Sequence, residues 1–221
     1  MKKVNGFLSA GVAFFAAFVL WTAVVSVVDV QAIGPNGSVV GFATLNGAFH
    51  RLTGVHWWLY TVTDWLGLVP VALLFGFAVL GLVQWIQRKR VWRVDADLLL
   101  LGGFYLLVLC AYLFFESYVI NYRPVLINGY LEASYPSSTT LLVLCVLPTA
   151  AMQWQRRIRN FGGKAFVTWL LWGFSAFMVI GRLLSGVHWL TDIIGGGLLS
   201  AGLVMLYVAA VACSKTTGNG T

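Results

Sequence analysis

The stretch GRLLSGVHWLTDIIGGGLLSAGLVMLYVAA, residues 181–210, joins a short polar segment to a long apolar one. Its polar part holds Arg182, His188 and Asp192, and no charged residue follows Asp192 up to residue 210. A helix needs about 20 apolar residues to cross the hydrocarbon core of a membrane. The stretch therefore predicts a membrane-spanning helix that begins at a group of polar side chains.

Further apolar runs of comparable length precede this helix. In all, six runs lie approximately at residues 6–28, 59–86, 98–120, 137–154, 165–184 and 190–212. The chain has 221 residues, of which 60% are hydrophobic and 10% charged, which is typical of a polytopic membrane protein. We expect an all-α membrane protein with six transmembrane helices in one domain, residues 1–221, and a disordered tail at 214–221.

The positions of lysine and arginine indicate how the chain is oriented. They precede the first run, join the second run to the third and the fourth to the fifth, and recur in the tail: Lys2, Lys3, Arg88, Lys89, Arg90, Arg93, Arg156, Arg157, Arg159, Lys164 and Lys215. Because cytoplasmic loops retain such residues, both termini are predicted to be cytoplasmic. The net charge of +7 then reflects topology, and no nucleic-acid partner is expected.

Polar residues from four helix ends meet at the opposite membrane surface. The third run ends in ESYVINYRP (116–124), the fourth begins near YPSSTT (135–140), the fifth ends near Arg182, and the sixth begins near HWLTD (188–192). Taken singly, such an arginine can reach for lipid headgroups, and a histidine or aspartate can cap a helix. Their convergence from distant parts of the chain predicts a functional site on the extracytoplasmic face.

The residue types in this group suit phosphoryl transfer. His188 and Asp192 are four positions apart, which on a helix puts both on one face. The carboxylate would fix the imidazole tautomer and leave the other nitrogen free as a nucleophile or base. Arg123 and Arg182 offer planar guanidinium groups to a phosphate. Pro136 suits a first helical turn, and the backbone N–H groups that follow it favour an anion, namely those of Ser137, Ser138 and Thr139.

At these residues the sequence resembles the type-2 phosphatidic acid phosphatases, a family that shares a superfamily with the vanadium haloperoxidases. The third motif of that family, S-R-x5-H-x3-D, is matched by Arg182, His188 and Asp192, with Gly181 in place of the serine. The resemblance implies a two-step hydrolysis of a lipid phosphate that needs no metal and no cofactor. It also implies that His188 carries a phosphohistidine and that Asp192 orients it.

The other two motifs of the family are matched only in part. The first, K-x6-R-P, ends in the RP of residues 123–124, but Glu116 stands where the lysine belongs. The second, P-S-G-H, begins with the PS of residues 136–137, but Thr139 replaces the histidine that donates a proton to the leaving group. A threonine hydroxyl is a poor general acid at neutral pH.

These departures leave three interpretations open. In the first, the substrate is a lipid diphosphate, for example a polyprenyl diphosphate, whose phosphate leaving group needs little protonation. In the second, Glu116 is the proton donor, since a partly buried carboxyl can retain its proton; other residues on this side offer further donors: Tyr118, Tyr122, Tyr130, Tyr135, His50 and His56. In the third, the protein is a catalytically impaired homologue that binds anionic lipid headgroups for sensing, scaffolding or transport.

The expected location is a multi-pass position in the cell membrane, of the bacterial plasma-membrane type, with the site facing outward. The expected partners are membrane lipids and a lipid phosphate or diphosphate substrate, and the sequence does not indicate an oligomeric state. Cys110, Cys145 and Cys213 are scattered along or near the apolar runs, which disfavours a disulfide framework or a metal site.

Overall fold

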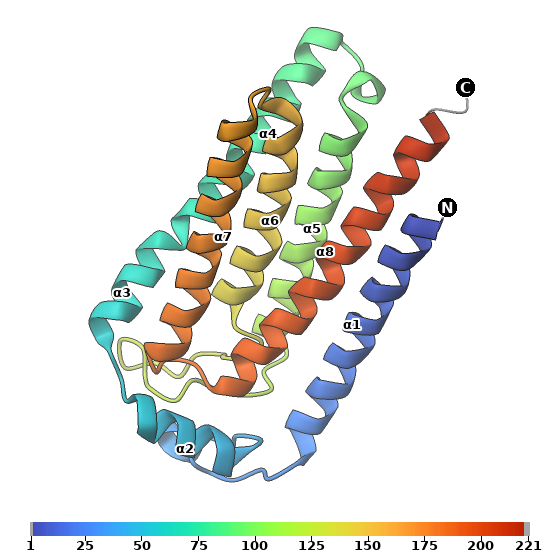
Figure 1. The fold of residues 1–221 in the computed structure, drawn as a ribbon. Helices are drawn as coiled ribbons and strands as arrows, with labels where there is room; N and C mark the ends of the chain where they lie inside the picture. Colours follow the sequence, from blue (N-terminus) through green and yellow to red (C-terminus); the bar gives the residue numbers. More distant parts are fainter. Residues whose placement is uncertain (1, 219–221) are drawn as a thin grey trace.

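A computed structural model describes residues 2–218 of the chain, which fold into a bundle of long helices (Figure 1). The described residues form no strand, only isolated β-bridges in the loops. The helices are α1 Lys2–Val27, η1 Pro35–Gly37, α2 Ala43–Thr53, α3 Trp57–Leu66, α4 Leu68–Arg88, η2 Val91–Arg93, α5 Ala96–Ser117, α6 Ser138–Arg157, α7 Phe161–Leu184 and α8 Leu190–Gly218. The prediction of an all-α polytopic membrane protein is confirmed at this level.

Five segments of the described chain are long and apolar enough to cross a membrane: Lys2–Val27, Trp57–Arg88, Ala96–Ser117, Phe161–Leu184 and Leu190–Ser214. They correspond to five of the six apolar runs, with α3 and α4 together forming the second. The remaining run, 137–154, becomes α6, a helix of 20 residues that is less apolar than the others. Six spanning helices therefore remain a prediction.

The position of α6 explains its composition. It lies at the centre of the bundle, in contact with α4, α5, α7 and α8, and eleven of its residues are buried. Its polar side chains are satisfied inside the protein. Thr149 bonds to Tyr105, and Gln153 bonds to Tyr207. A helix that its neighbours shield from lipid does not need an apolar surface all round, because intramolecular hydrogen bonds can satisfy its polar groups.

The surrounding helices present apolar side chains outward. Leu20 on α1, Phe75 on α4, Leu106 on α5 and Trp169 on α7 are all more than half exposed. Large apolar residues covering the outside of a bundle are what a lipid environment stabilises, whereas a soluble protein would bury them. This distribution is consistent with a multi-pass membrane protein.

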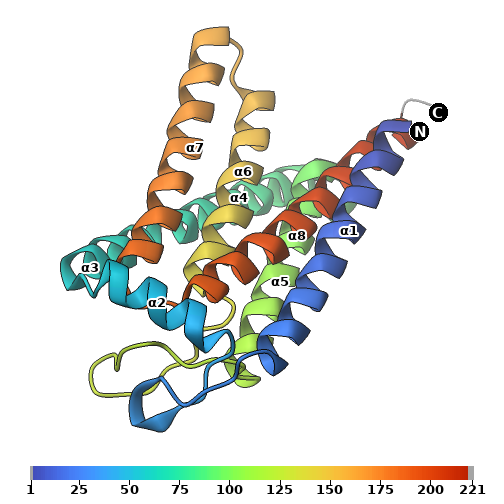
Figure 2. The same ribbon diagram turned by 60° about the horizontal axis from the view of Figure 1, so that its bottom comes forward.

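Helices α1 and α8 lie side by side and antiparallel in both views (Figures 1 and 2). Two glycines permit their close approach. A Cβ atom at Gly11 would lie 2.9 Å from the Leu206 side chain, and one at Gly202 would lie 3.1 Å from the backbone nitrogen of Phe15. Small residues at such a contact allow two membrane helices to pack backbone to backbone. This packing fixes α8, whose first turn carries Asp192, against the first helix of the chain.

The two ends of the bundle differ in what they carry. The first residues of α1, the last of α8 and the basic α4–α5 and α6–α7 loops lie at one end (Figure 1). Helix α2 and the α5–α6 loop lie together over the other end (Figure 2). Of the tail expected at 214–221, residues up to Gly218 continue α8, and the remainder falls outside the described residues. All the sequence-derived site residues belong to the end covered by α2.

Candidate active site

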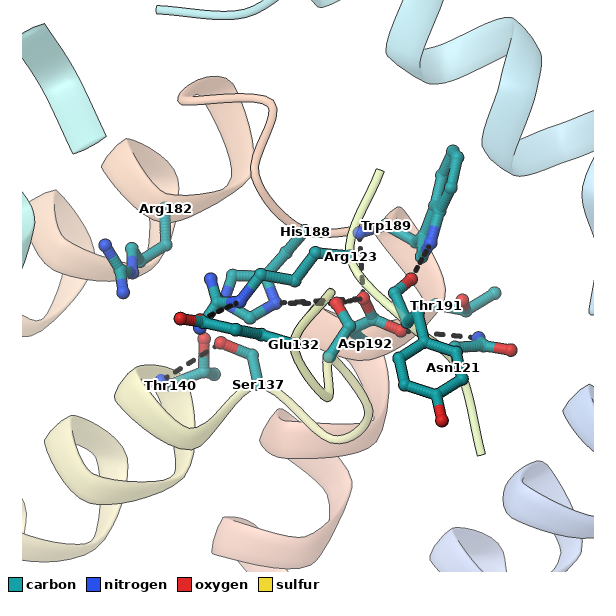
Figure 3. A network of polar contacts seen from close by, with 12 residues as sticks. Asn121, Arg123, Glu132, Ser137, Thr140, Arg182, His188, Trp189, Thr191 and Asp192 are labelled. Carbon is teal, nitrogen blue, oxygen red and sulfur yellow. Dashed lines mark hydrogen bonds and ion pairs between the residues drawn. The ribbon is translucent and has the colours of Figure 1, made fainter. Parts of the chain in front are cut away.

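His188 lies in the turn between α7 and α8. Since α8 begins at Leu190, only Asp192 of the expected pair is helical, and the prediction that both share one helical face is wrong. Gly186 makes the turn possible: its φ is +71°, and a Cβ there would lie 2.0 Å from the carbonyl oxygen of Gly54. Asp192 Oδ2 accepts the Trp189 N–H at 2.8 Å and so caps the start of α8 (Figure 3).

Ser134 connects His188 to Asp192. Its hydroxyl oxygen lies 3.0 Å from Nδ1 of His188 and also makes a short hydrogen bond to Oδ2 of Asp192. The direct distance from Nδ1 to Oδ2 is 3.7 Å, which is too long for a hydrogen bond. All three side chains are buried. The carboxylate therefore acts on the imidazole through a serine hydroxyl, whereas the sequence predicted direct contact.

The hydrogen-bond partners of His188 determine its tautomer. A carboxylate can only accept, so the single Ser134 hydroxyl proton goes to Asp192, and Ser134 Oγ accepts from Nδ1–H of His188. On the other side of the ring, Nη1 of Arg123 lies 3.2 Å from Nε2. A guanidinium can only donate, so Nε2 must carry the lone pair. Both neighbours thus indicate a neutral imidazole with a free nucleophilic Nε2.

The surroundings of His188 also favour the neutral ring. Burial lowers the pKa of His188 well below its ordinary value, and the positive charges of Arg123 and Arg182 lower it further. Two cations beside an imidazole disfavour a third positive charge. His188 is therefore available as a nucleophile across the neutral pH range.

A hairpin within the α5–α6 loop positions Arg123. Asn128 and Gly129 have φ values of +49° and +84°, as a tight two-residue hairpin turn requires, and Ile127 pairs with Tyr130 across it. The two arms then run antiparallel, and the Arg123 N–H donates to the Glu132 carbonyl at 3.0 Å. Opposed residues of such arms extend their side chains to the same face.

This pairing places a carboxylate against the guanidinium of Arg123. Nε of Arg123 lies 3.1 Å from Oε2 of Glu132, within ion-pair distance, although the alignment is too poor for a hydrogen bond. The two groups still attract each other as an ion pair, because the Coulomb energy depends on their separation and not on hydrogen-bond alignment. Figure 3 shows Glu132 and Arg123 on the same side of His188 as the first turn of α6.

Arg182 is buried near the end of α7 and faces α3. Its guanidinium lies 4.9 Å from the centre of the Tyr60 ring and 3.2 Å from Oδ1 of Asp64. A weak bond of 3.4 Å joins it to the Thr63 hydroxyl, while its Nε has no hydrogen-bond partner among residues 2–218. The structure thus brings Arg123 into contact with His188, whereas Arg182 stands further off and is anchored by α3.

The first turn of α6 faces the same region. Ser137 is the N-cap, and its hydroxyl accepts the Thr140 N–H at 3.4 Å. Its own backbone N–H donates to the Asp192 carbonyl at 3.0 Å, so the expectation that this amide binds phosphate is wrong. The N–H groups of Ser138 and Thr139 belong to the first turn and have no acceptor within the helix. The buried Thr140 hydroxyl likewise lacks a partner in the described chain.

An apolar groove of about 1140 Å³ reaches the site from the side. It runs between α4, α5 and α6, from Trp85 and Val94 near the basic end of the bundle to Asp64, Ser138 and Thr139 beside the site. Most of its wall is leucine, valine, phenylalanine, alanine and glycine. The residue that replaces the expected proton-donating histidine, Thr139, therefore lines this groove. An apolar channel that ends beside the first turn of α6, whose Ser138 and Thr139 amides have no acceptor within the helix, suits a molecule with a long apolar part and a polar end.

No cluster of three or more histidine, cysteine, aspartate or glutamate side chains that could hold a metal ion occurs within residues 2–218. The charged groups around His188 are those described above. They consist of the Asp192 carboxylate, which reaches the imidazole through Ser134, the two guanidinium groups, and the carboxylates that pair with them, Glu132 with Arg123 and Asp64 with Arg182.

A comparison with protein families accounts for this arrangement. The model of the PAP2 superfamily matches residues 97–213, which is more than half of the chain. The chain belongs to the PAP2 superfamily. The matched segment extends from the start of α5 into α8 and includes Arg123, Arg182, His188 and Asp192. The family resemblance inferred from the third motif is thereby confirmed.

The PAP2 fold is also recognisable among solved structures. The chain is similar to the crystal structure described as the first transmembrane PAP2 type phosphatidylglycerolphosphate phosphatase from Bacillus subtilis. The two share 21% sequence identity with a TM-score of 0.60, over 93% of this chain and 96% of that one. At this identity the similarity concerns the fold. No curated protein sequence matches the chain.

Glu116, the candidate proton donor of the sequence analysis, lies at the end of α5, where its side chain is exposed. It borders a small cavity of about 10 Å³ that Ser134 and Ser138 also line. It makes no hydrogen bond or ion pair with another described residue. Its role in this PAP2 protein remains a prediction.

The sequence analysis missed two residues of the site, Ser134 and Glu132. For Glu132 a signal was present: Asn128-Gly129 between Ile127 and Tyr130 is a strong hairpin pattern, and folding about it brings Glu132 opposite Arg123. No comparable signal pointed to Ser134, whose contacts are with residues more than 50 positions away.

Proposed function

We propose that this protein is an integral-membrane lipid phosphatase that hydrolyses a lipid phosphate or diphosphate through a phosphohistidine at His188. The observation that carries the proposal is the neutral Nε2 of a buried histidine in contact with Arg123. The apolar groove that ends at Ser138 and Thr139, in the first turn of α6, adds to it. Family membership supports the same reading. We also propose that the reaction needs no metal, because guanidinium and amide groups suffice to hold the phosphate charge.

The proposed first step is attack of His188 Nε2 on phosphorus. Arg123 would move its Nη1 from Nε2 to a phosphate oxygen, and Arg182 and the amides of Ser138 and Thr139 would hold the remaining oxygens. The imidazole gains positive charge as the P–N bond forms. Nδ1–H then interacts more strongly with the Ser134 hydroxyl, which is polarised by the Asp192 carboxylate. Water hydrolyses the phosphohistidine in the second step.

The groove supports a lipid substrate. Burying an acyl or prenyl chain contributes about 0.8 kcal/mol per methylene group, so a groove of this volume would supply most of the binding free energy. The similar Bacillus subtilis protein is a phosphatidylglycerolphosphate phosphatase by its description, which agrees with a lipid phosphate as the substrate class.

If no other side chain supplies the missing proton, a lipid diphosphate, such as a polyprenyl diphosphate, suits this chain better than phosphatidic acid. Thr139 cannot replace a histidine as proton donor, and the leaving group of a diphosphate is a phosphate that departs with little protonation. The hypothesis predicts faster turnover of the diphosphate than of phosphatidic acid. Equal rates on the two would count against it.

For topology we propose six spanning helices, with α6 as the fourth, shielded crossing. The basic loops and both termini would then face the cytoplasm, and the site would face outward from a bacterial plasma membrane. The basic residues of the α4–α5 and α6–α7 loops support this orientation, since both loops lie at the end opposite to His188.

The test is phosphate release by purified full-length protein in detergent with a chelator present. The substrates are undecaprenyl diphosphate, phosphatidylglycerol phosphate and phosphatidic acid. Release by the wild type and its loss in His188→Ala is the expected result. The matched control is Ser175→Ala, since Ser175 is buried in α7 and bonds only to its own helix, at Leu171. If the wild type releases no phosphate from any of the three, the protein is the headgroup-binding homologue instead.

A further inference from the structure

Glu132 occupies an unusual place for an anion in a site built to bind phosphate. Its carboxylate lies 3.1 Å from Nε of Arg123, whose Nη1 touches the proposed nucleophile. Tyr60 of α3 and Tyr112 of α5 are close enough to interact electrostatically with it. Glu132 therefore lies between the helices that border the groove and the residue that would hold the transferred phosphoryl group.

A phosphate that binds Arg123 would lie next to the Glu132 carboxyl, which pairs with the same guanidinium. An ionised Glu132 would repel that phosphate, since both carry negative charge. A neutral carboxylic acid in the same place would donate a hydrogen bond to a phosphate oxygen. Its side chain is 40% exposed, so it is free to rotate away from Arg123 when the guanidinium turns to the phosphate.

The reaction lacks a proton donor that the chain must supply in some other way. Thr139 stands where the family motif has its donor, and Thr139 borders the groove through which the lipid would lie. Glu116 is exposed and makes no contact with Arg123 or His188. Asp192 is engaged by Ser134 and Trp189, and Asp64 pairs with Arg182, which stands further from His188. Glu132 is the carboxyl whose partner, Arg123, contacts His188 directly.

We propose that Glu132 is the catalytic acid and base of this enzyme, in place of the missing histidine. The inference rests on the proposed phosphohistidine mechanism. In the first step the Nε2 lone pair forms the P–N bond, the P–O bond to the lipid breaks, and the leaving oxygen takes the Glu132 proton. In the second step the Glu132 carboxylate takes a proton from water, the water oxygen bonds to phosphorus, and the P–N electron pair returns to His188.

The experiment compares two phosphate esters that differ in their need for an acid. Octyl phosphate expels a basic alkoxide, whereas p-nitrophenyl phosphate expels a stable phenolate that needs no proton. In Glu132→Gln the first step on octyl phosphate should slow by about 10²–10⁴-fold, the usual contribution of a general acid. With p-nitrophenyl phosphate, Glu132→Gln should release one equivalent of nitrophenolate per enzyme in an initial burst. The rate of this burst should be reduced less than tenfold relative to the wild type. Slow turnover follows the burst, because the second step has lost its base.

Further arms separate this role from its alternatives. A uniform loss on both esters without a burst would mean that Glu132 only holds Arg123, and the proposal would be overturned. The proposal would also be overturned if Glu116→Gln lost more activity on octyl phosphate than on p-nitrophenyl phosphate while Glu132→Gln did not. Added formate should restore the activity of Glu132→Ala on octyl phosphate, since a small acid can reach this half-exposed position. A misfolded variant would not regain activity with formate.

Failure of the proposed function would look different from failure of this inference. If the wild type carries no His188-dependent activity on any ester or lipid, the phosphatase proposal fails and Glu132 has no reaction to assist. If the wild type is active and Glu132→Gln retains full activity on octyl phosphate, only the acid–base assignment fails.

Discussion

Asp192 has two structural roles at once. One carboxylate oxygen caps α8 through the Trp189 N–H and also receives the Ser134 hydroxyl, while the other lies 3.5 Å from the Asn121 amide. The start of α8 and the orientation of the imidazole therefore depend on the same carboxylate. A substitution at Asp192 would alter both the cap of α8 and the contact to the imidazole through Ser134. A substitution at Ser134 removes only the hydroxyl between His188 and Asp192.

We expect Ser134→Ala to lower kcat with little effect on KM. The hydroxyl links Nδ1 of His188 to Asp192, and a hydrogen bond to a charged group contributes about 1.5–3 kcal/mol. If that contribution is made mainly in the transition state, kcat falls by about 10–10²-fold. Steady-state kinetics on the preferred lipid phosphate gives the answer.

The same prediction is sharpened by a double-mutant cycle. If Ser134 and Asp192 act through one connection, Ser134→Ala combined with Asp192→Asn should be little worse than Asp192→Asn alone. Full additivity of the two losses would show that Ser134 does not transmit the effect of Asp192. Ser175→Ala serves as the control for removing a buried hydroxyl elsewhere.

The lowered pKa of His188 predicts a stability that depends on pH. An unfolded histidine takes up a proton below about pH 6.5, while His188 in the folded protein resists it, so folding loses stability as the pH falls below that value. The slope is at most about 1.4 kcal/mol per pH unit. The variant His188→Gln lacks this contribution. Thermal unfolding in detergent at pH 7.5 and pH 5 should therefore show the wild type losing more stability than the variant; parallel changes would contradict the prediction.

At the scale of elements, the glycines of α8 fix how closely it approaches the site. A Cβ at Gly195 would lie 2.6 Å from the buried Tyr135 ring, and one at Gly196 would lie 3.1 Å from the Ser137 carbonyl oxygen. Tyr135 follows Ser134 directly in the chain. The contact between α8 and the α6 N-terminus therefore sets the position of the hydroxyl that reaches His188.

We predict that Gly195→Ala destabilises the protein by about 1–3 kcal/mol, as overpacking of a tight contact usually does. It should also reduce kcat, because Tyr135 must shift and carries Ser134 with it. Gly197→Ala is the matched control on the same helix: a Cβ there meets nothing within 4 Å, and alanine favours helix by up to about 1 kcal/mol. Melting temperatures and kinetics of the two variants should diverge; equal behaviour would mean that the contact does not position the site.

The elements differ in how far they were predictable from sequence. Long lipid-facing helices such as α1, α4 and α7 follow from hydropathy, because lipid selects for apolar surface. Helix α6 is recognised less clearly, since burial among other helices relaxes that demand. The His188 turn was misread as helix because spacing alone does not show where a helix begins. Ser134 could not be found, since its partners are brought together only by tertiary packing.

At the scale of the whole molecule, the groove connects the two ends of the bundle. The basic α4–α5 and α6–α7 loops lie at one end and the site lies at the other, and the groove of about 1140 Å³ runs along the helices between them. A lipid whose headgroup lies beside Ser138 would extend its chain along α5, past Gly102 and Gly103. Neither glycine has a neighbouring atom within 4 Å of a Cβ position, so these two positions leave the groove open.

We expect Gly103→Phe to fill the groove and weaken binding of long-chain substrates. Loss of part of the buried chain should reduce kcat/KM for a lipid phosphate by about tenfold or more, with little change for p-nitrophenyl phosphate. Leu107→Phe puts the same aromatic side chain on α5 at an exposed position outside the groove and is the control. A loss shared equally by both substrates would indicate damage to the fold instead of a blocked groove.

The placement of His188 and Asp192 late in the chain also bears on how the protein is made. His188 precedes the final helix and Asp192 belongs to it, so both residues leave the ribosome after those of α1 to α7. Packing of α8 against α1, the first helix made, then brings together the two ends of the chain. Under the proposed mechanism a chain that stops before α8 lacks Asp192 and should be inactive.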